Sequence, residues 1–264
     1  MVSIITVVRN GESCIQYCID SIKNQSYENI EYIIIDGCST DNTLNIIRRN
    51  SDSISYWISE PDDGIYFAMN KGITVAQGDI IGILNADDLY YPTTIERVVQ
   101  AFKSHDFHGY TSGPIDLIDA NGVTYGISTP LSFEKRYIRR FIEMPCSHQS
   151  VFVSKTVYQS CGVFDTHFKL SADYDLILRF MHHNIPCIEL HESLGAFRSG
   201  GQSTSLKSNI DTFMVHRKYN LPLIKAIFYF CRSSLAKLLM NFMNPGLFQF
   251  IRIGRKSKYS YDVN

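Results

Sequence analysis

An acidic cluster follows an apolar run near the end of the first third of the chain. Ile80 to Leu84 lead directly into Asn85-Ala86-Asp87-Asp88. Side chains alternate along a strand, so Asn85 and Asp87 should share one side at the point where the chain leaves the sheet. Carboxylate oxygens suit Mn²⁺ and Mg²⁺, which leave coordination positions for phosphate oxygens. We expect Asp87 to hold such an ion; a loop opening or helix cap is the alternative.

The elements that must position this cluster alternate between strands and helices. The predicted strands span residues 3–8, 31–36, 55–59 and 80–85. The predicted helices between them span residues 14–22, 43–49 and 65–75. This alternation predicts an α/β fold, with a parallel sheet and helices on its faces. Ligands bind at the carboxyl edge of such a sheet, and the acidic cluster belongs to that edge.

The remainder of the chain has a different pattern. From about residue 105 to 200 the strands become shorter, and Asp119 to Gly122 predict a hairpin turn between strands 114–117 and 123–127. Two helices are expected beyond Asn220, with a break at Asn244-Pro245-Gly246. Residues 1 to 216 carry 16 Lys and Arg against 25 Asp and Glu, whereas residues 217 to 264 carry 9 against 1. A basic tail therefore follows an acidic body.

Several protein classes are disfavoured by composition. Seven cysteines at irregular spacing predict neither a disulfide framework nor a zinc site. No apolar run is long enough to span a membrane, and the first residues lack a basic leader, so we expect a cytoplasmic protein. A dinucleotide-binding Gly-x-Gly-x-x-Gly does not follow the first strand, where Val8 to Glu12 stand instead. The acidic body argues against a nucleic-acid partner.

Four further motifs surround the acidic cluster. They are Ile33 to Thr43, Glu60 to Tyr66, Ala68 to Gly72, and Ala76 to Asp79. In order and spacing they resemble the family 2 glycosyltransferases over about residues 2 to 200. The resemblance implies a GT-A fold, with a Rossmann-like, mostly parallel sheet, helices on both faces and a C-terminal helical extension. It divides the chain into a nucleotide-sugar-binding half (1–104), an acceptor-binding half of the same domain (105–215) and a basic, amphipathic helical tail (216–264).

Roles for the donor site follow from the resemblance. Thr6 and Val8 would meet the nucleoside through their backbone, and Asp36 would accept a hydrogen bond from the uracil N3–H. A buried carboxylate of this kind selects a base because the wrong base leaves it unpaired. Asp62 and Asp63 are candidates for the ribose or the donor sugar, and we favour Asp63. The alternative for each carboxylate is an ordinary turn residue.

Lys71 would balance phosphate charge, although an exposed helical lysine is an equally good interpretation. Asn85, Ala86 and Asp87 are expected to line the donor site. The family often has Asp at the position of Asn85, so the metal would have one strong carboxylate here. Arg is also common at the position of Met69, so one contact to the nucleotide is lacking.

The second half should supply the catalytic base. Asp173 matches the acidic residue that deprotonates the acceptor hydroxyl in the family, and a single base without a covalent intermediate implies inversion. Asp175 is the internal competitor, and simple helix capping is the alternative. His148 and Gln149 match a pair that contacts acceptor or phosphates, and a structural histidine is the other interpretation. Arg198, in a loop that reaches Ser203, would clamp the diphosphate.

The resemblance also implies a function. Glu60 to Tyr66 and Ser147 to Phe152 are most similar to bacterial enzymes that build O-antigen, capsule or exopolysaccharide repeat units. Gln-x-x-Arg-Trp, typical of processive members, is absent, and the single Trp is Trp57. We expect non-processive transfer of a hexose from a UDP-sugar to a polyprenyl-diphosphate-linked saccharide. The alternative is a non-catalytic module that binds sugar nucleotides or carbohydrate.

The tail has an apolar stripe at spacings of three and four. Its members are Ile224, Ile227, Phe228, Cys231, Leu235, Leu238, Leu239 and Phe242. Basic residues accompany this stripe and recur further on, together with Phe248, Phe250 and Ile251; they are Lys225, Arg232, Lys237, Arg252, Arg255, Lys256 and Lys258. A second basic group comprises Lys135, Arg136, Arg139 and Arg140. Both groups suit an anionic membrane surface at the inner leaflet. Packing of the tail on the catalytic domain or in a homo-oligomer is the alternative.

Overall fold

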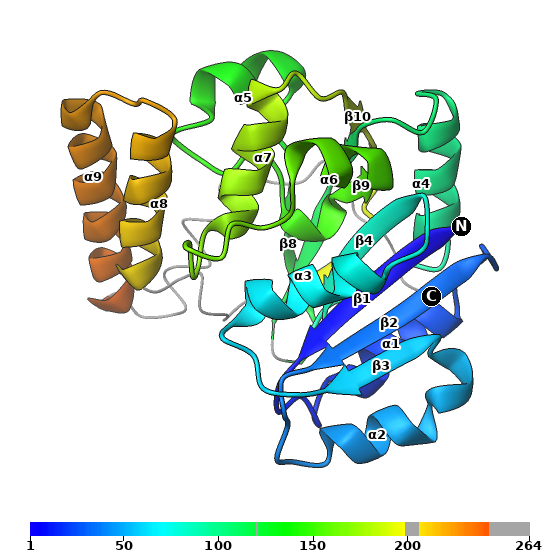
Figure 1. Ribbon diagram of the computed structural model, residues 1–264. Coiled ribbons are helices and arrows are strands. Elements are labelled where there is room, and N and C mark those ends of the chain that lie inside the picture. The colour runs from blue at the N-terminus through cyan, green and yellow to red at the C-terminus, as the bar shows by residue number, and fades with distance from the viewer. Residues whose placement is uncertain (120, 199–205, 243–264) are drawn as a thin grey trace.

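The computed structural model describes residues 1–119, 121–198 and 206–242 (Figure 1). Its main sheet has seven strands, in the order β10-β6-β9-β4-β1-β2-β3. These strands are β1 (Val2–Val8), β2 (Ile30–Asp36), β3 (Tyr56–Ser59), β4 (Ile80–Asn85), β6 (Tyr110–Ser112), β9 (Phe152–Ser154) and β10 (Cys187–Glu189). Only β9 runs antiparallel to its neighbours, β4 and β6. The predicted mostly parallel α/β sheet is confirmed.

The strand register aligns the carboxyl ends of the four N-terminal strands. Val8 at the end of β1 is opposite Asp36 on β2, and Asp36 is opposite Ser59 on β3. On the other side of β1, Val7 is opposite Asn85 on β4. The loops that leave these strands therefore share one edge of the sheet.

Alternation along the buried strands divides the core into two layers. On β1, Ile5 and Val7 belong to one apolar cluster, while Ile4 and Val8 belong to the other. The first cluster is covered by α3 (Ile65–Val75), α6 (Lys155–Cys161) and α7 (Ala172–His182). The second is covered by α1 (Ile15–Lys23), α2 (Thr43–Arg49), which η1 (Ser51–Ser53) follows, and α4 (Thr94–Lys103). Helices thus lie on both faces of the sheet (Figure 1).

A second, smaller sheet has four strands, three of which come from residues 105 to 215. Its order is β5-β11-β7-β8, with the bounds β5 (Leu89–Tyr90), β11 (Gly195–Arg198), β7 (Ile115–Ile118) and β8 (Thr124–Ser128). β7 and β8 form the predicted hairpin, shifted by one residue. Asp119 Oδ1 accepts hydrogen bonds from the backbone N–H groups of Asn121 and Val123, and Gly122 adopts a φ of 83° that a side chain would disfavour.

The remaining helices are α5 (Phe133–Arg139), η2 (His148–Ser150), α8 (Leu206–Lys218) and α9 (Leu223–Phe242). α9 packs on α8, and α8 packs on α7. His216 on α8 lies at the centre of this contact, 3.2 Å from the Tyr174 hydroxyl, with edge-on ring contacts to Phe141 and Tyr229. Burial lowers the pKa of His216 to about 4, so its ring is neutral at pH 7. The predicted helix of the tail is confirmed, whereas the break at 244–246 and the second helix lie outside the described residues.

None of the helices in the described ranges combines the length and the apolar character needed to cross a membrane.

We expect Gly72→Ala to destabilise the fold by about 1–3 kcal/mol, although alanine normally favours a helix. A Cβ at this position would stand 2.4 Å from Cγ2 of Ile5, which is fully buried in β1. α3 would have to move away from the sheet to accommodate it. The measurement is the free energy of unfolding in urea, followed by circular dichroism.

Gly126→Ala is the matched control, because its Cβ would meet only Leu117 Cδ1 at 3.8 Å. Equal stability of the Gly72 variant and wild type would contradict the tight contact between α3 and β1.

Candidate active site

The loop after β4 presents the acidic cluster at the carboxyl edge of the sheet. Asp87 is partly exposed, whereas Ala86 and Asp88 are buried. The Asn85 side-chain amide lies 3.2 Å from Nε2 of His148. Asn85 Oδ1 is buried and has no hydrogen-bond donor within residues 1–119, 121–198 and 206–242. This loop therefore presents one accessible carboxylate beside one unsatisfied amide oxygen.

Oxygen atoms of this kind fit a divalent metal that keeps most of its coordination for a diphosphate and water. Asp87 and Asn85 would be its two protein ligands. Among the described residues, no three His, Cys, Asp or Glu side chains converge on a common point. A metal here would therefore depend on the donor's phosphates for further ligands.

Asp88 connects this loop to the second sheet. Its Oδ1 accepts a hydrogen bond from the backbone N–H of Arg198 at 3.1 Å, and its Oδ2 accepts one from Gln149 Nε2 at 3.1 Å. Burial, followed by the charge of Asp87, raises the pKa of Asp88 to about 7. Arg198 Nη1 donates to the backbone oxygen of Asp119 at 3.0 Å. Residues 199–203 of the predicted closing loop lie outside the described residues.

Asp173 lies in the first turn of α7 and reaches the same edge. Its Oδ1 accepts a hydrogen bond from the Tyr66 hydroxyl at 2.9 Å and another from the Tyr174 backbone N–H at 2.9 Å. Its Oδ2 is 3.8 Å from His148 Nδ1. A quarter of the Asp173 side chain is exposed, so one carboxylate oxygen remains open to an incoming hydroxyl.

His148 stands between the two acidic positions. One ring nitrogen faces Asp173, and the other faces the amide of Asn85. Burial lowers the pKa of His148 below its usual range, against the opposing effects of the Asp173 and Asp87 carboxylates. The neutral ring therefore joins the acidic loop to the carboxylate of α7 without adding a positive charge.

Asp175, the competitor of Asp173, has a structural environment. It is fully buried, and it forms ion pairs with Arg179 and with Lys218, whose Nζ lies 2.7 Å away. The Tyr219 hydroxyl also donates to it at 3.2 Å. No face of this carboxylate is open to a substrate.

Asp36 is fully buried where β2 ends. Its Oδ1 accepts a hydrogen bond from Ser39 Oγ at 2.5 Å, and its Oδ2 accepts from the Ser39 backbone N–H at 2.9 Å and from Ser59 Oγ at 2.6 Å. The carboxylate thus shapes the turn after β2. Its role toward a nucleobase stays a prediction.

Thr6 and Val8 occupy β1 as expected. Thr6 is buried, and its hydroxyl accepts a hydrogen bond from the Tyr32 hydroxyl at 3.2 Å. The backbone oxygen of Val8 accepts a hydrogen bond from the N–H of Gly37 at 2.8 Å. β1 therefore supports the turn that Asp36 shapes.

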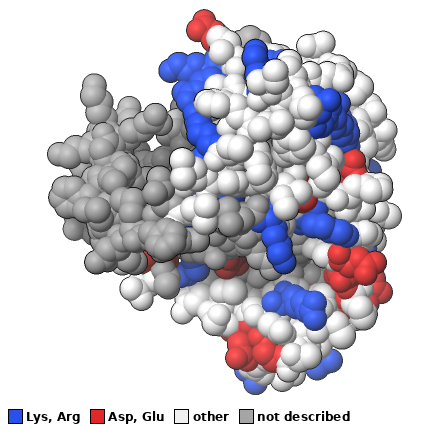
Figure 2. Space-filling view, turned by 90° about the vertical axis from the view of Figure 1, so that its left-hand side faces the viewer, with Lys and Arg blue, Asp and Glu red and all other residues white. Residues whose placement is uncertain are grey.

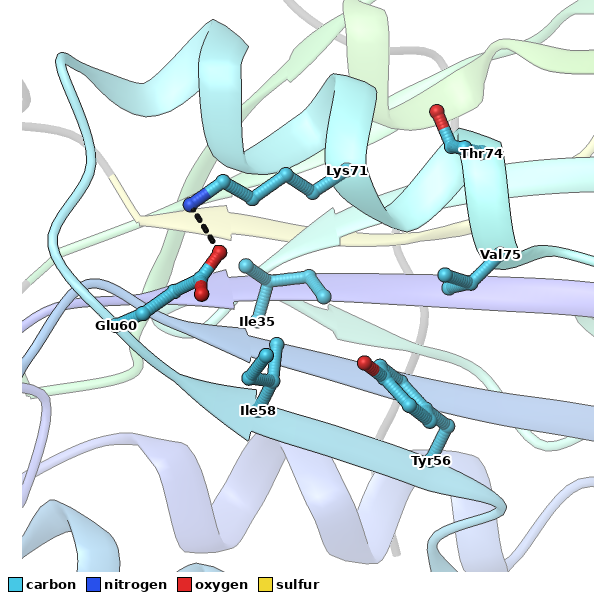
Figure 3. A pocket seen from close by; sticks show the side chains of 7 residues that line it. All are labelled: Ile35, Tyr56, Ile58, Glu60, Lys71, Thr74 and Val75. Atoms are coloured by element: carbon cyan, nitrogen blue, oxygen red, sulfur yellow. Dashed lines mark ion pairs between the residues drawn. The ribbon is translucent and has the colours of Figure 1, made fainter.

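Lys71 points toward carboxylates of its own chain. Its Nζ lies 2.6 Å from Glu60, the ion pair drawn in Figure 3, and 2.5 Å from Asp62. Lys71 also borders a hollow of about 240 Å³ beneath α3, whose floor is mostly apolar. Asp63 is exposed, whereas only 7% of the Asp62 side chain is accessible. No hydrogen-bond donor to Asp62 Oδ2 exists among the described residues, and a Cβ on Gly37 would lie 3.5 Å from this oxygen.

Two residues at the site, Tyr66 and Asp62, make contacts that the sequence patterns did not predict. Tyr66 ends the motif that begins at Glu60, but nothing local indicates that it reaches Asp173. Asp62 was less favoured than Asp63, although Asp62 is the buried member of the pair. A period-3.6 count along α3 could have placed Tyr66 and Met69 on the inward face.

A mostly parallel α/β sheet with an acidic loop at its carboxyl edge and a partner carboxylate on a later helix defines a GT-A type glycosyltransferase. Residues 3–161 match the model of the family described as glycosyl transferase family 2, and the chain belongs to this family. It is 30% identical over 187 residues to an uncharacterized glycosyltransferase of Mycobacterium tuberculosis, a match that covers 67% of this chain and 68% of that protein. A PGL/p-HBAD biosynthesis glycosyltransferase of Mycobacterium bovis is 27% identical over 196 residues, covering 69% and 74%.

Solved structures agree on the fold. Staphylococcus aureus TarS, residues 1–349 in complex with UDP-GlcNAc, superposes with a TM-score of 0.67 at 15% identity, covering 89% of this chain and 72% of that one. The mannosyltransferase PcManGT of Pyrobaculum calidifontis, in complex with GDP-Man and Mn²⁺, gives a TM-score of 0.64 at 15% identity, covering 96% and 79%. The predicted GT-A fold, family and enzyme class are confirmed.

We expect protonation of Asp88 to stabilise the metal-free protein as the pH falls from 8 to 5. Burial raises the pKa of Asp88 to about 7 in the folded chain, whereas the ordinary value is 3.8. The folded state therefore binds the additional proton between these values, and this contribution is lost as the pH rises through 7. Burial lowers the pKa values of His216 and His148, which act in the opposite direction, so the contribution is measured as the difference between wild type and Asp88→Asn. It should be on the order of 1–4 kcal/mol, by urea unfolding in EDTA across this pH range.

In Asp88→Asn this contribution should be absent, because the amide does not titrate. Asp52→Asn, at an exposed position on η1, is the control and should keep the pH dependence of wild type. The same pH dependence in Asp88→Asn as in wild type would contradict the raised pKa of Asp88.

Proposed function

We propose that this enzyme transfers a hexose, with inversion, from a UDP-sugar to a saccharide acceptor. The observation that carries the proposal is the geometry of Asp173. Its Oδ2 faces the edge of the sheet that carries Asp87 and Asn85. His148 lies between, with Nδ1 3.8 Å from Asp173 Oδ2 and Nε2 3.2 Å from the Asn85 amide. A base and an acidic loop at one edge suit a direct displacement at the anomeric carbon.

In this reaction Asp173 Oδ2 takes the proton of an acceptor hydroxyl while the oxygen forms a bond to the anomeric carbon. The bond from that carbon to the β-phosphate oxygen breaks, and UDP leaves with the electron pair. Asp175, the other carboxylate in the first turn of α7, is enclosed by Arg179 and Lys218 and is therefore not available as a nucleophile. A single displacement inverts the anomeric configuration.

Mn²⁺ or Mg²⁺, when bound, would neutralise charge on the leaving diphosphate. Asp87 and the unsatisfied Asn85 Oδ1 are the groups that would hold it. Ala86 places its backbone between these two ligands, and Arg198 approaches the same loop through its bond to Asp88. We assign Arg198 to the diphosphate on this basis.

The nucleoside is assigned to the turn after β2. Asp36 holds that turn through Ser39, and the buried Asp62 Oδ2 next to Gly37 is an acceptor for a base N–H or a ribose hydroxyl. A buried acceptor without a donor favours a ligand that supplies one. The positive charge of Lys71 balances the negative charges of Asp62 and Glu60. We assign Asp63 to the donor sugar.

We assign the acceptor to a polyprenyl-diphosphate-linked saccharide on the inner leaflet. α9 supports this assignment, because Ile224 and Phe228 are 84% and 61% exposed beside the exposed Lys225 and Arg232. Figure 2, which faces the α8–α9 side, shows separate patches of Lys and Arg in a largely uncharged surface in the upper part of this face. Apolar side chains with flanking cations suit an anionic membrane interface.

α5 extends the same surface. Ile138 is 78% exposed and Lys135 is exposed next to it. The end of α5 meets α9 through His216, which contacts Phe141 on one side and Tyr229 on the other. We therefore propose a cytoplasmic enzyme that is peripheral on the membrane. Its product would be a repeat unit of a surface polysaccharide, built one sugar per encounter. A relative named as a PGL/p-HBAD biosynthesis glycosyltransferase supports a role in a biosynthetic route.

Asp173→Asn should lower kcat about 100- to 10,000-fold, because the amide cannot take the acceptor proton. The measurement is UDP release from UDP-glucose, UDP-galactose and UDP-N-acetylglucosamine with Mn²⁺.

Asp87→Ala should weaken Mn²⁺ binding in the presence of UDP, as measured by electron paramagnetic resonance. Asp52→Asn should match wild type in both assays. Full activity of the Asp173 variant would overturn the assignment of the base.

Replacing Ile224 and Phe228 by serine should reduce binding to vesicles of 30% phosphatidylglycerol by about 10-fold or more, because roughly 0.8 kcal/mol is lost per buried CH₂ group. Co-sedimentation measures the bound fraction. Tyr17→Ser, at an exposed aromatic position on α1, is the control. Unchanged binding, with light scattering showing a dimer that dissociates in the variant, would assign this face to a homo-oligomer.

A further inference from the structure

Two halves of the chain meet at Tyr66. This residue lies in the first turn of α3, directly after the loop that carries Asp62, and its hydroxyl donates to Asp173 Oδ1 across a separation of 107 residues. The ring is 8% exposed and stacks on Phe164, with centroids 5.3 Å apart and planes at 28°. The phenol therefore approaches the carboxylate from a fixed position.

Asn70, one turn further along α3, fastens the segment that leads to α7. Its Nδ2 donates to the backbone oxygen of Phe164 at 2.9 Å, and its Oδ1 accepts from the Phe164 N–H at 3.0 Å. The amide thus satisfies both backbone groups of the residue on which Tyr66 stacks. Phe164 cannot shift without breaking two hydrogen bonds and the ring contact.

The two oxygens of Asp173 have different environments as a result. Oδ1 accepts hydrogen bonds from Tyr66 and from the Tyr174 backbone, whereas Oδ2 has, in the part of the chain that the structure describes, only His148 Nδ1 at 3.8 Å. Burial, followed by the Asp173 charge, raises the pKa of the Tyr66 hydroxyl well above its usual range. It therefore remains a donor at every pH at which the enzyme is folded.

We propose that Tyr66 is a positioning residue for the catalytic base: it holds Oδ1 of Asp173, so that Oδ2 is the atom presented to the acceptor hydroxyl. This inference rests on the proposed role of Asp173. Because Tyr66 and Asp62 belong to one loop and helix, the same α3 that borders the donor's nucleoside also orients the base. A displacement of α3 changes both contacts together.

Tyr66→Phe tests the proposal, because phenylalanine keeps the stack on Phe164 and removes only the hydroxyl. We expect kcat for UDP release to fall by about 10- to 100-fold, with KM for the UDP-sugar nearly unchanged. The acid limb of the pH profile of kcat should also move to higher pH, because the carboxylate loses a hydrogen bond that favours its charged form, which is the active form of the base.

Other groups facing Asp173 are His148 from η2 and Cys146 in the segment before it, and Asp87 acts on His148 from the β4 loop. These three residues are unchanged in Tyr66→Phe, so a shift of the acid limb of the pH profile reports the loss of the Tyr66 hydroxyl. Carboxylate ¹³C NMR titration provides the same readout without turnover, with the Asp173 signal identified by its absence in Asp173→Asn.

Tyr219→Phe is the matched control. It also removes a hydroxyl bonded to a carboxylate of α7, but that carboxylate is Asp175. It should lose comparable thermal stability while kcat and the acid limb stay at wild-type values. An active Asp173→Asn would refute the base itself. An inactive Asp173→Asn together with wild-type kcat and an unmoved Asp173 titration in Tyr66→Phe would refute the role of Tyr66 alone.

Discussion

Helix α3 lies directly on strand β1 because Gly72 has no side chain where Cγ2 of Ile5 passes. This contact determines the depth at which the helix sits on the sheet. From that position its first turn reaches α7 through Tyr66, its middle fastens Phe164 through Asn70, and Lys71 reaches the loop before the helix. The arrangement of the site therefore depends on how closely one helix packs against one strand.

Burying a charge costs free energy, and this cost separates the carboxylates of the site into buried and partly exposed ones. A buried carboxylate needs hydrogen bonds or a cation, and Asp36, Asp88 and Asp175 all have such partners within the protein. Asp87 and Asp173 remain partly exposed. The structural carboxylates fix loops and helix ends, and the two open ones are those for which we propose ligand roles. Burial and partners separate these roles, although all five residues look alike in the sequence.

The sequence predicted the local elements well, because apolar alternation and helix periodicity are properties of neighbouring residues. Strands β1 to β4, helices α1 to α3, the hairpin of β7 and β8 and helix α9 were predicted, whereas η1 and β5 were not. The antiparallel insertion of β9 was not, since pairing between distant strands leaves no local pattern. At the site, the motifs pointed to Asp173 and the β4 loop, but the hydrogen bond from Tyr66 to Asp173 joins residues 107 positions apart, which no local pattern indicates. The choice between Asp62 and Asp63 depended on burial, which a loop of adjacent carboxylates does not encode.

The antiparallel strand β9 has a consequence for how the chain is made. β9 joins β4 to β6, so the outer edge of β4 has no partner until residue 154 has left the ribosome. At ordinary rates of synthesis this edge stays open for on the order of ten seconds. An unpaired edge of an apolar strand is a template for wrong pairing. The nascent chain is therefore most vulnerable to aggregation between the emergence of its first four strands and that of β9, an interval in which chaperones would find an exposed strand to protect.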